Sequence, residues 1–152
     1  MKEEQLERQI HENFPIAKTM GMKVKSLSAT HSELVFPLGP NHNNIGTAFG
    51  GSLYSAAIFA CYALYRKLLS DNGIEEGRFL NRKAEMEYAA PTTKDFVAKA
   101  EIDAASNEVE RFIQGMRRRG TSQLPMKAEI LIDEKPVAHF RASFIMTPLE
   151  RS

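Results

Sequence analysis

The sequence predicts an α+β fold in which an antiparallel sheet wraps around one long buried helix. Residues 51–69 are apolar on nearly every side of a helix, with no charged residue before Arg66, and this pattern is typical of a buried helix. The second half of the chain instead holds runs in which apolar and polar residues alternate. A period of two indicates strands with one covered face. Strands segregated from one apolar helix favour the α+β class.

The first forty residues predict a helix followed by a hairpin. Pro15 is expected to end or redirect the helix over residues 3–14. Residues 22–29 alternate apolar groups with lysines and serines, and residues 32–38 are rich in β-forming residues, so we expect two short paired strands there. The apolar stripe of the helix consists of residues four positions apart: Leu6, Ile10 and Phe14.

Four alternating runs in the second half predict the longer strands. In the first run the even positions, beginning with Leu80, are mostly apolar and are expected to share the covered face. Residues 133–135 (Asp-Glu-Lys) are expected to form the hairpin turn between the last two runs. The runs are residues 80–90, 96–103, 126–132 and 138–146.

A small helical insertion is predicted between the second and third of these strands. Residues 106–122 carry Val109, Phe112, Ile113 and Met116 at helical spacing, after a cap at Ser106 or Asn107. The edges of an antiparallel sheet need covering, and we therefore expect a homodimer that continues the sheet.

Composition sets further limits. The chain has 152 residues, 43% hydrophobic and 26% charged, and we interpret residues 1–152 as one soluble domain. Cys61 is the single cysteine, so no intrachain disulfide forms, which fits a reducing compartment. No apolar run approaches the ~20 residues that cross a bilayer, the first residues do not resemble a secretion signal, and the net charge is +1. We expect a cytoplasmic protein with no membrane or nucleic-acid partner and no metal site.

Residues 43–57, NNIGTAFGGSLYSAA, carry a resemblance to a known family. They are similar to the Asn-x-x-Gly-Thr-x-His-Gly-Gly segment of phenylacetic-acid-type thioesterases of the hotdog fold. Phe49 replaces the histidine, and this form resembles more closely the thioesterase branch typified by the C-terminal domain of YiiD. Residues 87–102 resemble the strand, Tyr-x-x-Pro, strand segment of the same proteins. The matching positions of the first motif are Asn43, Gly46, Thr47, Gly50 and Gly51.

The resemblance implies hydrolysis of acyl thioesters carried by coenzyme A or an acyl carrier protein, at the interface of a homodimer or a dimer of dimers. Coenzyme A or phosphopantetheine would be part of the substrate, with no separate cofactor. Independently, a helix N-terminus offers unsatisfied N–H groups to a developing oxyanion, and Gly51 is our first choice for this donor, with Asn43 as its polar neighbour. The substrate contacts expected around them are Asn44, Gly46, Thr47, Phe49, Gly50, Tyr54 and Ile58. The alternative is that the two glycines only allow close helix packing.

The chain departs from the phenylacetic-acid-type pattern at Ile58, where that branch has the aspartate that acts on water. Isoleucine cannot accept a proton, so a hydrolase needs a base elsewhere. His42 and Glu85 are the main candidates, with Glu87 beside them, although a solvated loop histidine and exposed strand carboxylates are the ordinary alternatives. A hotdog module that binds thioesters without hydrolysing them is the second hypothesis.

An arginine cluster and two serines are further candidates for a functional role. Arg117, Arg118 and Arg119 could meet the phosphates of coenzyme A or an acidic carrier protein, or simply form a solvated helix end. Ser52 and Ser55 lack the Gly-x-Ser-x-Gly pattern of a serine hydrolase.

Overall fold

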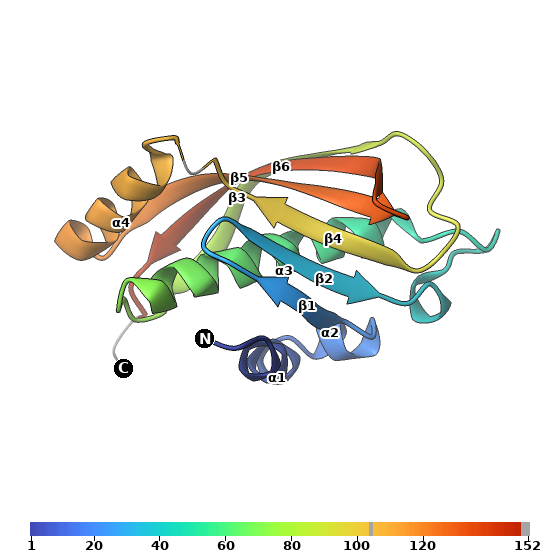
Figure 1. The fold of residues 1–152 in the computed structure, drawn as a ribbon, viewed down its shortest axis with the longest axis horizontal. Helices are drawn as coiled ribbons and strands as arrows, with labels where there is room; N and C mark the ends of the chain where they lie inside the picture. The colour runs from blue at the N-terminus through green and yellow to red at the C-terminus, as the bar shows by residue number, and fades with distance from the viewer. Residues whose placement is uncertain (104, 150–152) are drawn as a thin grey trace.

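The computed structural model describes residues 1–103 and 105–149. These residues form five α-helical or 3₁₀ segments and six strands, and Figure 1 shows how they are arranged. In order they are α1 (Glu3–Asn13), α2 (Pro15–Thr19), β1 (Lys23–Leu27), β2 (His31–Phe36), η1 (Gly39–Asn41), α3 (Gly50–Asp71), β3 (Arg78–Tyr88), β4 (Phe96–Glu101), α4 (Glu108–Arg119), β5 (Ser122–Ile132) and β6 (Lys135–Thr147).

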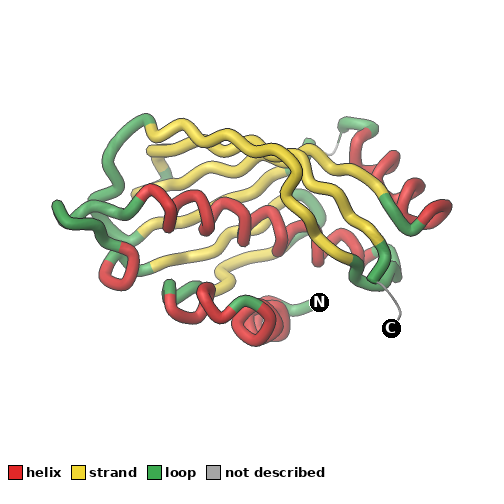
Figure 2. The backbone as a smooth tube through the Cα atoms, turned by 180° about the vertical axis from the view of Figure 1, so that it is seen from behind, coloured by secondary structure: helices red, strands yellow, loops and turns green. Residues whose placement is uncertain are grey.

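The predicted α+β architecture is confirmed. The strands form one antiparallel sheet in the order β1-β2-β4-β5-β6-β3, and α3 runs along one face of it (Figure 2). This helix packs mainly against β4, β2 and β5. Twelve of its 22 residues are buried, because a helix that is apolar on most sides can be covered by the sheet on one side and by the N-terminal helices on another.

The two helices at the N-terminus behave as expected from Pro15. This residue occupies the first turn of α2 and so redirects the chain after α1. Phe14, between the two helices, packs edge-on against Phe59 and Tyr62 of α3, with ring centroids 5.6 and 5.1 Å away. These contacts hold α1 and α2 against the side of α3 that the sheet leaves open.

Helix α1 also closes one edge of the sheet. Glu7 and His11 lie one turn apart on α1. Glu7 Oε1 accepts the Val24 N–H of β1 at 2.9 Å, and His11 Nε2 donates at 2.8 Å to the carbonyl of Met22, the residue just before β1. These backbone N–H and C=O groups already have side-chain partners and cannot pair with an added strand. Part of the β1 edge is thus blocked, whereas β3 at the other end of the sheet pairs, among the residues that the structure describes, only with β6.

We predict that Glu7→Ala lowers the free energy of unfolding by about 1–3 kcal/mol, because the partly buried Val24 N–H then loses its acceptor. The measurement is equilibrium urea unfolding at fixed protein concentration. Glu7→Gln keeps an oxygen at the same place and serves as the control. Equal losses in both variants would show that the carboxylate charge, rather than the edge hydrogen bond, is what stabilises α1.

The prediction that Leu80 faces the core is wrong, because β3 contains a bulge. The register with β6 shifts between Asn81 and Lys83, and such an extra residue reverses which side chains face each side. Phe79 instead turns inward and stacks on Phe144 at 4.2 Å, whereas Leu80 is 48% exposed. Because of the same shift, Asn81 does not lie on the outer face of the sheet with Lys83 and Glu85. Beyond the bulge, Ala84 and Met86 pack against the core as predicted, whereas Tyr88 and Ala90 are exposed.

Strand β5 begins four residues earlier than the alternation predicted, and its early part contains Pro125. Proline cannot donate to a ladder and is disfavoured in a central strand. Here β4 ends opposite Lys127, so at Pro125 strand β5 has a neighbour only in β6, where Pro125 pairs with Ser143. A locally one-sided strand accommodates the proline.

The insertion helix and the last hairpin follow the sequence closely. Asn107 rather than Ser106 is the N-cap residue of α4, although its side chain makes no capping bond. Phe112 and Ile113 are buried, and the rings of Phe112 and Tyr65 meet edge-on, with centroids 6.2 Å apart. Figure 1 shows α4 above the C-terminal end of α3. Asp133 and Glu134 both have positive φ (49° and 65°), the conformation of a two-residue hairpin turn.

Burial raises the pKa of Tyr65 in α3 to about 12. Because an unfolded tyrosine titrates near 10, both states are protonated below pH 10, and between about pH 10 and 12 only the unfolded state ionises. We therefore predict that stability is lost across this window, by about 2 kcal/mol from Tyr65 alone. Urea unfolding between pH 8 and 12 measures the slope, which should be shallower in Tyr65→Phe. An unchanged slope in that variant would contradict the assignment.

Candidate functional site

The start of α3 presents two free N–H groups. Phe49 is the N-cap residue, and its carbonyl accepts the N–H groups of Ser52 and Leu53 at 2.9 and 3.2 Å. Within the part of the chain that the structure describes, the N–H groups of Gly50 and Gly51 have no acceptor. They lie at the positive end of a 22-residue helix. Ser52 is a first-turn helix residue, as expected.

The loop before this helix is organised by Asn43. Its Oδ1 accepts the N–H groups of Ile45 and Thr47 at 3.0 and 3.1 Å, and its Nδ2 donates to Thr47 Oγ1 at 2.8 Å. Gly46 completes the turn with a φ of +82°, which glycine adopts without strain. The Asn43 side chain therefore holds the shape of the loop. Asn44 and Gly46 are exposed at its tip.

Backbone bonds on both sides anchor the end of this loop. The Phe49 N–H donates to the Asn41 carbonyl at 2.7 Å, and the Ala48 N–H donates to the Thr92 carbonyl at 2.8 Å. Asn41 is itself buried and donates through Nδ2 to the carbonyls of Met20 and Pro37. Phe49, and with it the beginning of α3, is thereby fixed to two separate parts of the chain.

Two aromatic rings frame the glycine pair. The Tyr88 hydroxyl, at the end of β3, donates to the Gly50 carbonyl at 2.9 Å, and a Cβ on Gly50 would lie 3.4 Å from the Tyr88 ring. On Gly51 a Cβ would lie only 2.5 Å from Cε1 of Phe49. Both rings remain more than half exposed, at 51% and 59%. A side chain at position 51 would therefore push against the Phe49 ring, whereas a Cβ at position 50 would make ordinary contact with the Tyr88 ring.

Of the other predicted contacts, Tyr54 and Ile58 extend along α3 from the glycines. Both are partly buried at the margin of the core, and Tyr54 packs edge-on against Phe140 at 5.4 Å. Ile58 is seven residues from Gly51, which is about 10 Å and two turns along the same helix face. Ser55 lies between them on this face and donates its hydroxyl to the Gly51 carbonyl at 2.9 Å, and Ile58 offers no carboxylate to act on water.

The two candidate bases lie in different places. His42 is exposed beside the glycines, in the loop, and its Nδ1 donates to the Asn43 carbonyl at 2.8 Å, which leaves Nε2 as the atom that can accept a proton. Glu85 and Glu87 lie on the outer face of β3, whereas Ala84 and Met86 face the core. His42 forms an isolated β-bridge with Ala48, two residues before α3 begins, whereas Glu85 lies on the outer face of the sheet.

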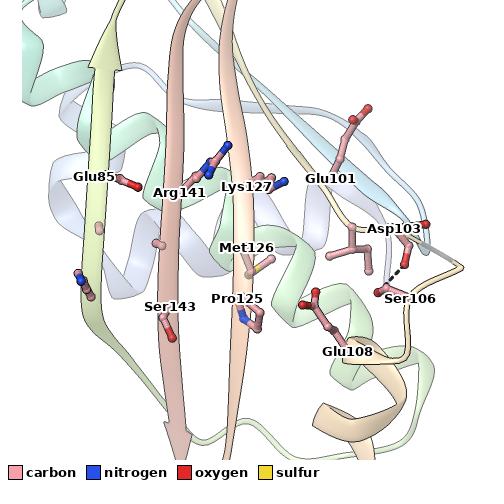
Figure 3. A pocket seen from close by; sticks show the side chains of 14 residues that line it. Glu85, Glu101, Asp103, Ser106, Glu108, Pro125, Met126, Lys127, Arg141 and Ser143 are labelled. Carbon is pink, nitrogen blue, oxygen red and sulfur yellow. Dashed lines mark hydrogen bonds between the residues drawn. The ribbon is translucent and has the colours of Figure 1, made fainter.

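Glu85 instead lines a hollow of about 600 Å³ on the outer face of the sheet. Figure 3 shows Glu85, Arg141 and Lys127 side by side on this face, with α3 passing behind the strands. Glu101, Asp103 and Glu108 border the opposite side of the hollow. Its walls are charged and face away from the glycine pair, so it is separate from the start of α3.

The arginine cluster lies far from the glycines. Arg117 in the last turn of α4 donates to the Asn72 carbonyl, at the other end of α3. A 22-residue helix is about 33 Å long, so these arginines lie far from the helix start of their own chain. Cys61 is buried, and burial raises the pKa of its thiol. The described residues contain no group of side chains arranged to hold a metal ion, and no helix among them is long and apolar enough to cross a bilayer.

Sequence reasoning misses two residues that shape the site. In the sequence, Asn41 is recognisable only as one residue of an amide-rich loop. Its burial depends on contacts with Met20 and Pro37 that no local pattern reveals. The alternation places Tyr88 on the covered side of a strand, and its bond to Gly50 joins positions 38 residues apart. The Tyr-x-x-Pro segment is the available signal for Tyr88.

Comparisons with known proteins find one matching family and several similar folds. A family model described as "Putative thioesterase (yiiD_Cterm)" matches residues 3–148. A protein of unknown function from Chlorobaculum tepidum has 26% identity and a TM-score of 0.87, over 95% of this chain and 94% of that one. A protein described as a "putative thioesterase" from Shewanella oneidensis has 19% identity and a TM-score of 0.82, over 96% and 97%.

A more distant structure has the same fold. A mutant of the phenylacetic acid degradation protein PaaI from Thermus thermophilus has 21% identity and a TM-score of 0.64, over 87% of this chain and 98% of that one. The hotdog arrangement expected from the sequence is therefore confirmed.

Proposed function

This chain belongs to the thioesterase family defined by the C-terminal domain of YiiD, and we propose that it hydrolyses acyl thioesters of coenzyme A or an acyl carrier protein. The observation that carries the proposal is the pair of free N–H groups on Gly50 and Gly51 at the positive end of α3. Such donors stabilise a carbonyl oxygen that gains negative charge. Glycine leaves these groups open to a carbonyl from the substrate.

In the proposed reaction, water attacks the thioester carbonyl carbon, and the carbonyl oxygen becomes an oxyanion that accepts the Gly51 N–H. Collapse of this intermediate breaks the carbon–sulfur bond. The acyl group leaves as a carboxylic acid, and the thiol of coenzyme A or phosphopantetheine takes up the proton that the water loses. Phe49, Tyr54 and Ile58 supply apolar contacts for the acyl chain.

We propose that a second copy of the chain completes the site through β3. This strand is 11 residues long and, in the described part of the chain, pairs only with β6, while α1 side chains bond to the backbone at the opposite edge, at Val24 of β1 and at Met22 just before it. Leu80 and Tyr88 on β3 are about half exposed, which suits an edge that another strand covers. Glu85 could then act as a base only toward the partner's site, whereas His42 belongs to the same loop as Asn43.

The second candidate is a module that binds thioesters without hydrolysing them, and Ile58 favours it because the face of α3 beyond the glycines offers no base. Measurements of thioester turnover and of thioester binding distinguish the hydrolase from the binding module. We expect thiol release and carboxylic acid formation with some member of a panel of acyl-coenzyme A and acyl-carrier-protein substrates of graded chain length. Calorimetry with a non-hydrolysable thioether analogue measures binding. Tight binding without turnover across the panel would overturn hydrolysis in favour of the binding module, and neither binding nor turnover would overturn both.

A further inference from the structure

We propose that Tyr88 is a positioning residue that orients and strengthens the Gly51 N–H as a hydrogen-bond donor; this inference rests on the proposed oxyanion role of that N–H. The Gly50 carbonyl and the Gly51 N–H belong to one peptide group. The Tyr88 hydroxyl donates to that carbonyl at 2.9 Å, while the N–H on the other side of the same group is free in the described chain. One peptide unit therefore connects the tyrosine to the donor.

Two physical effects follow from a hydrogen bond at the carbonyl. A peptide whose oxygen accepts a hydrogen bond is polarised, so its N–H becomes a stronger donor, and chains of hydrogen bonds reinforce one another in this way. The peptide group is also planar, so fixing its oxygen fixes the direction of its N–H. An oxyanion donor that is oriented before the reaction needs no reorganisation when charge develops.

The structure holds Tyr88 firmly enough to do this. Tyr88 pairs with Ala138 as the last residue of β3, and the N–H groups of Ala89 and Ala90 both donate to the Val137 carbonyl at 3.0 Å. Its ring packs against Gly50, where a Cβ would lie 3.4 Å away. A tyrosine hydroxyl is protonated at neutral pH and so can donate, and partial burial, with Tyr54 nearby, raises the pKa of Tyr88 further.

The glycine at position 50 is part of the same arrangement. A Cβ there would make only ordinary van der Waals contact with the Tyr88 ring, at 3.4 Å. The ring lies against the Gly50 backbone, and its hydroxyl reaches the carbonyl. The two glycines thus share one peptide group: Gly50 supplies the carbonyl that Tyr88 contacts, and Gly51 presents the donor.

The experiment compares wild type with Tyr88→Phe, which keeps the ring and removes the hydroxyl, and with Tyr65→Phe as the matched control. Tyr65 lies 14 residues along α3 from Gly51, about 21 Å away by helix rise. We expect Tyr88→Phe to lower kcat about tenfold with KM changed less than twofold, because the interaction strengthens in the transition state. Tyr65→Phe should leave both constants unchanged.

A second readout does not depend on turnover. In two-dimensional NMR of ¹⁵N-labelled protein, the amide proton resonance of Gly51 should move upfield in Tyr88→Phe, as expected for a weaker donor, and stay in place in Tyr65→Phe. An unmoved Gly51 resonance overturns the proposal whether or not the protein hydrolyses thioesters. So does an unchanged kcat in Tyr88→Phe when the wild type is active.

The outcomes separate this inference from the proposed function. A wild type that turns over no thioester contradicts hydrolysis alone, and the Gly51 resonance then still decides whether Tyr88 polarises the donor. An equal fall in kcat and rise in KM, together with a lowered melting temperature, would mean that the hydroxyl only docks β3 onto the helix, and this result also overturns the proposal.

Discussion

Replacing Gly51 by proline is expected to lower kcat for thioester hydrolysis by about 10²- to 10³-fold, the usual loss when one oxyanion donor is removed. Proline lacks the N–H, and Gly51 is the second residue of α3, a first-turn position where proline is tolerated. Gly50 before it has no Cβ, which eases the restriction that proline places on the preceding residue. Steady-state kinetics with the best substrate of the panel gives kcat, and circular dichroism checks the fold.

Gly51→Ala is the matched control, because it adds a side chain and keeps the N–H. Its Cβ would meet the Phe49 ring at 2.5 Å, but that ring is 59% exposed and can turn aside. We therefore expect a smaller loss in Gly51→Ala than in Gly51→Pro. Equal losses in the two variants would assign the effect to crowding at the rim and would remove the main support for an oxyanion donor at this position.

Phe144→Ala is expected to cost about 3–5 kcal/mol in the free energy of unfolding, the range for deleting a buried phenylalanine side chain. Phe144 of β6 is fully buried and stacks on Phe79 at 4.2 Å. Phe79 in turn packs against Tyr65 of α3 at 4.9 Å. Because this aromatic contact is a main link between β3 and the helix, its loss should also loosen the strand that ends at Tyr88.

Equilibrium unfolding at one fixed protein concentration measures this effect, since assembly would otherwise change the apparent stability. Ile16→Ala, at a position 56% exposed, is the control and should change the stability by less than about 0.5 kcal/mol. A loss below about 1 kcal/mol in Phe144→Ala, far under the usual range, would show that the ring is not the link between β3 and α3 that its contacts indicate.

The elements that the sequence predicted well are those with a strong local period. The helix predicted over residues 51–69 forms over Gly50–Asp71, and the alternating runs that end in the last hairpin form β5 and β6. A helix that is apolar on most sides has few alternatives to burial. The errors occur where one residue interrupts the period: the bulge after Asn81 reversed the expected side of Leu80, and Pro125 concealed the first part of β5.

The candidate site was predicted only in part. Its location at the glycine pair came from the resemblance together with the physics of helix ends. The roles around it depend on contacts that a single sequence does not reveal. Asn43, expected beside the substrate, directs its side chain into its own loop, while Tyr88, expected only as a strand residue, contacts the Gly50 carbonyl. The assignments of catalytic and substrate-binding residues stay predictions.

By itself the sequence determined the α+β class, the long buried helix and the glycine pair at its start, because periodicity, backbone freedom and helix-end polarity are local properties. Only the tertiary structure decided which sheet edge is open and which residues meet the glycines. Glu7 reaches β1 across 17 residues, and Tyr88 reaches Gly50 across 38. Such contacts depend on the registers of distant strands, and a shift of one residue, as at the β3 bulge, exchanges the side chains on the two faces of a sheet.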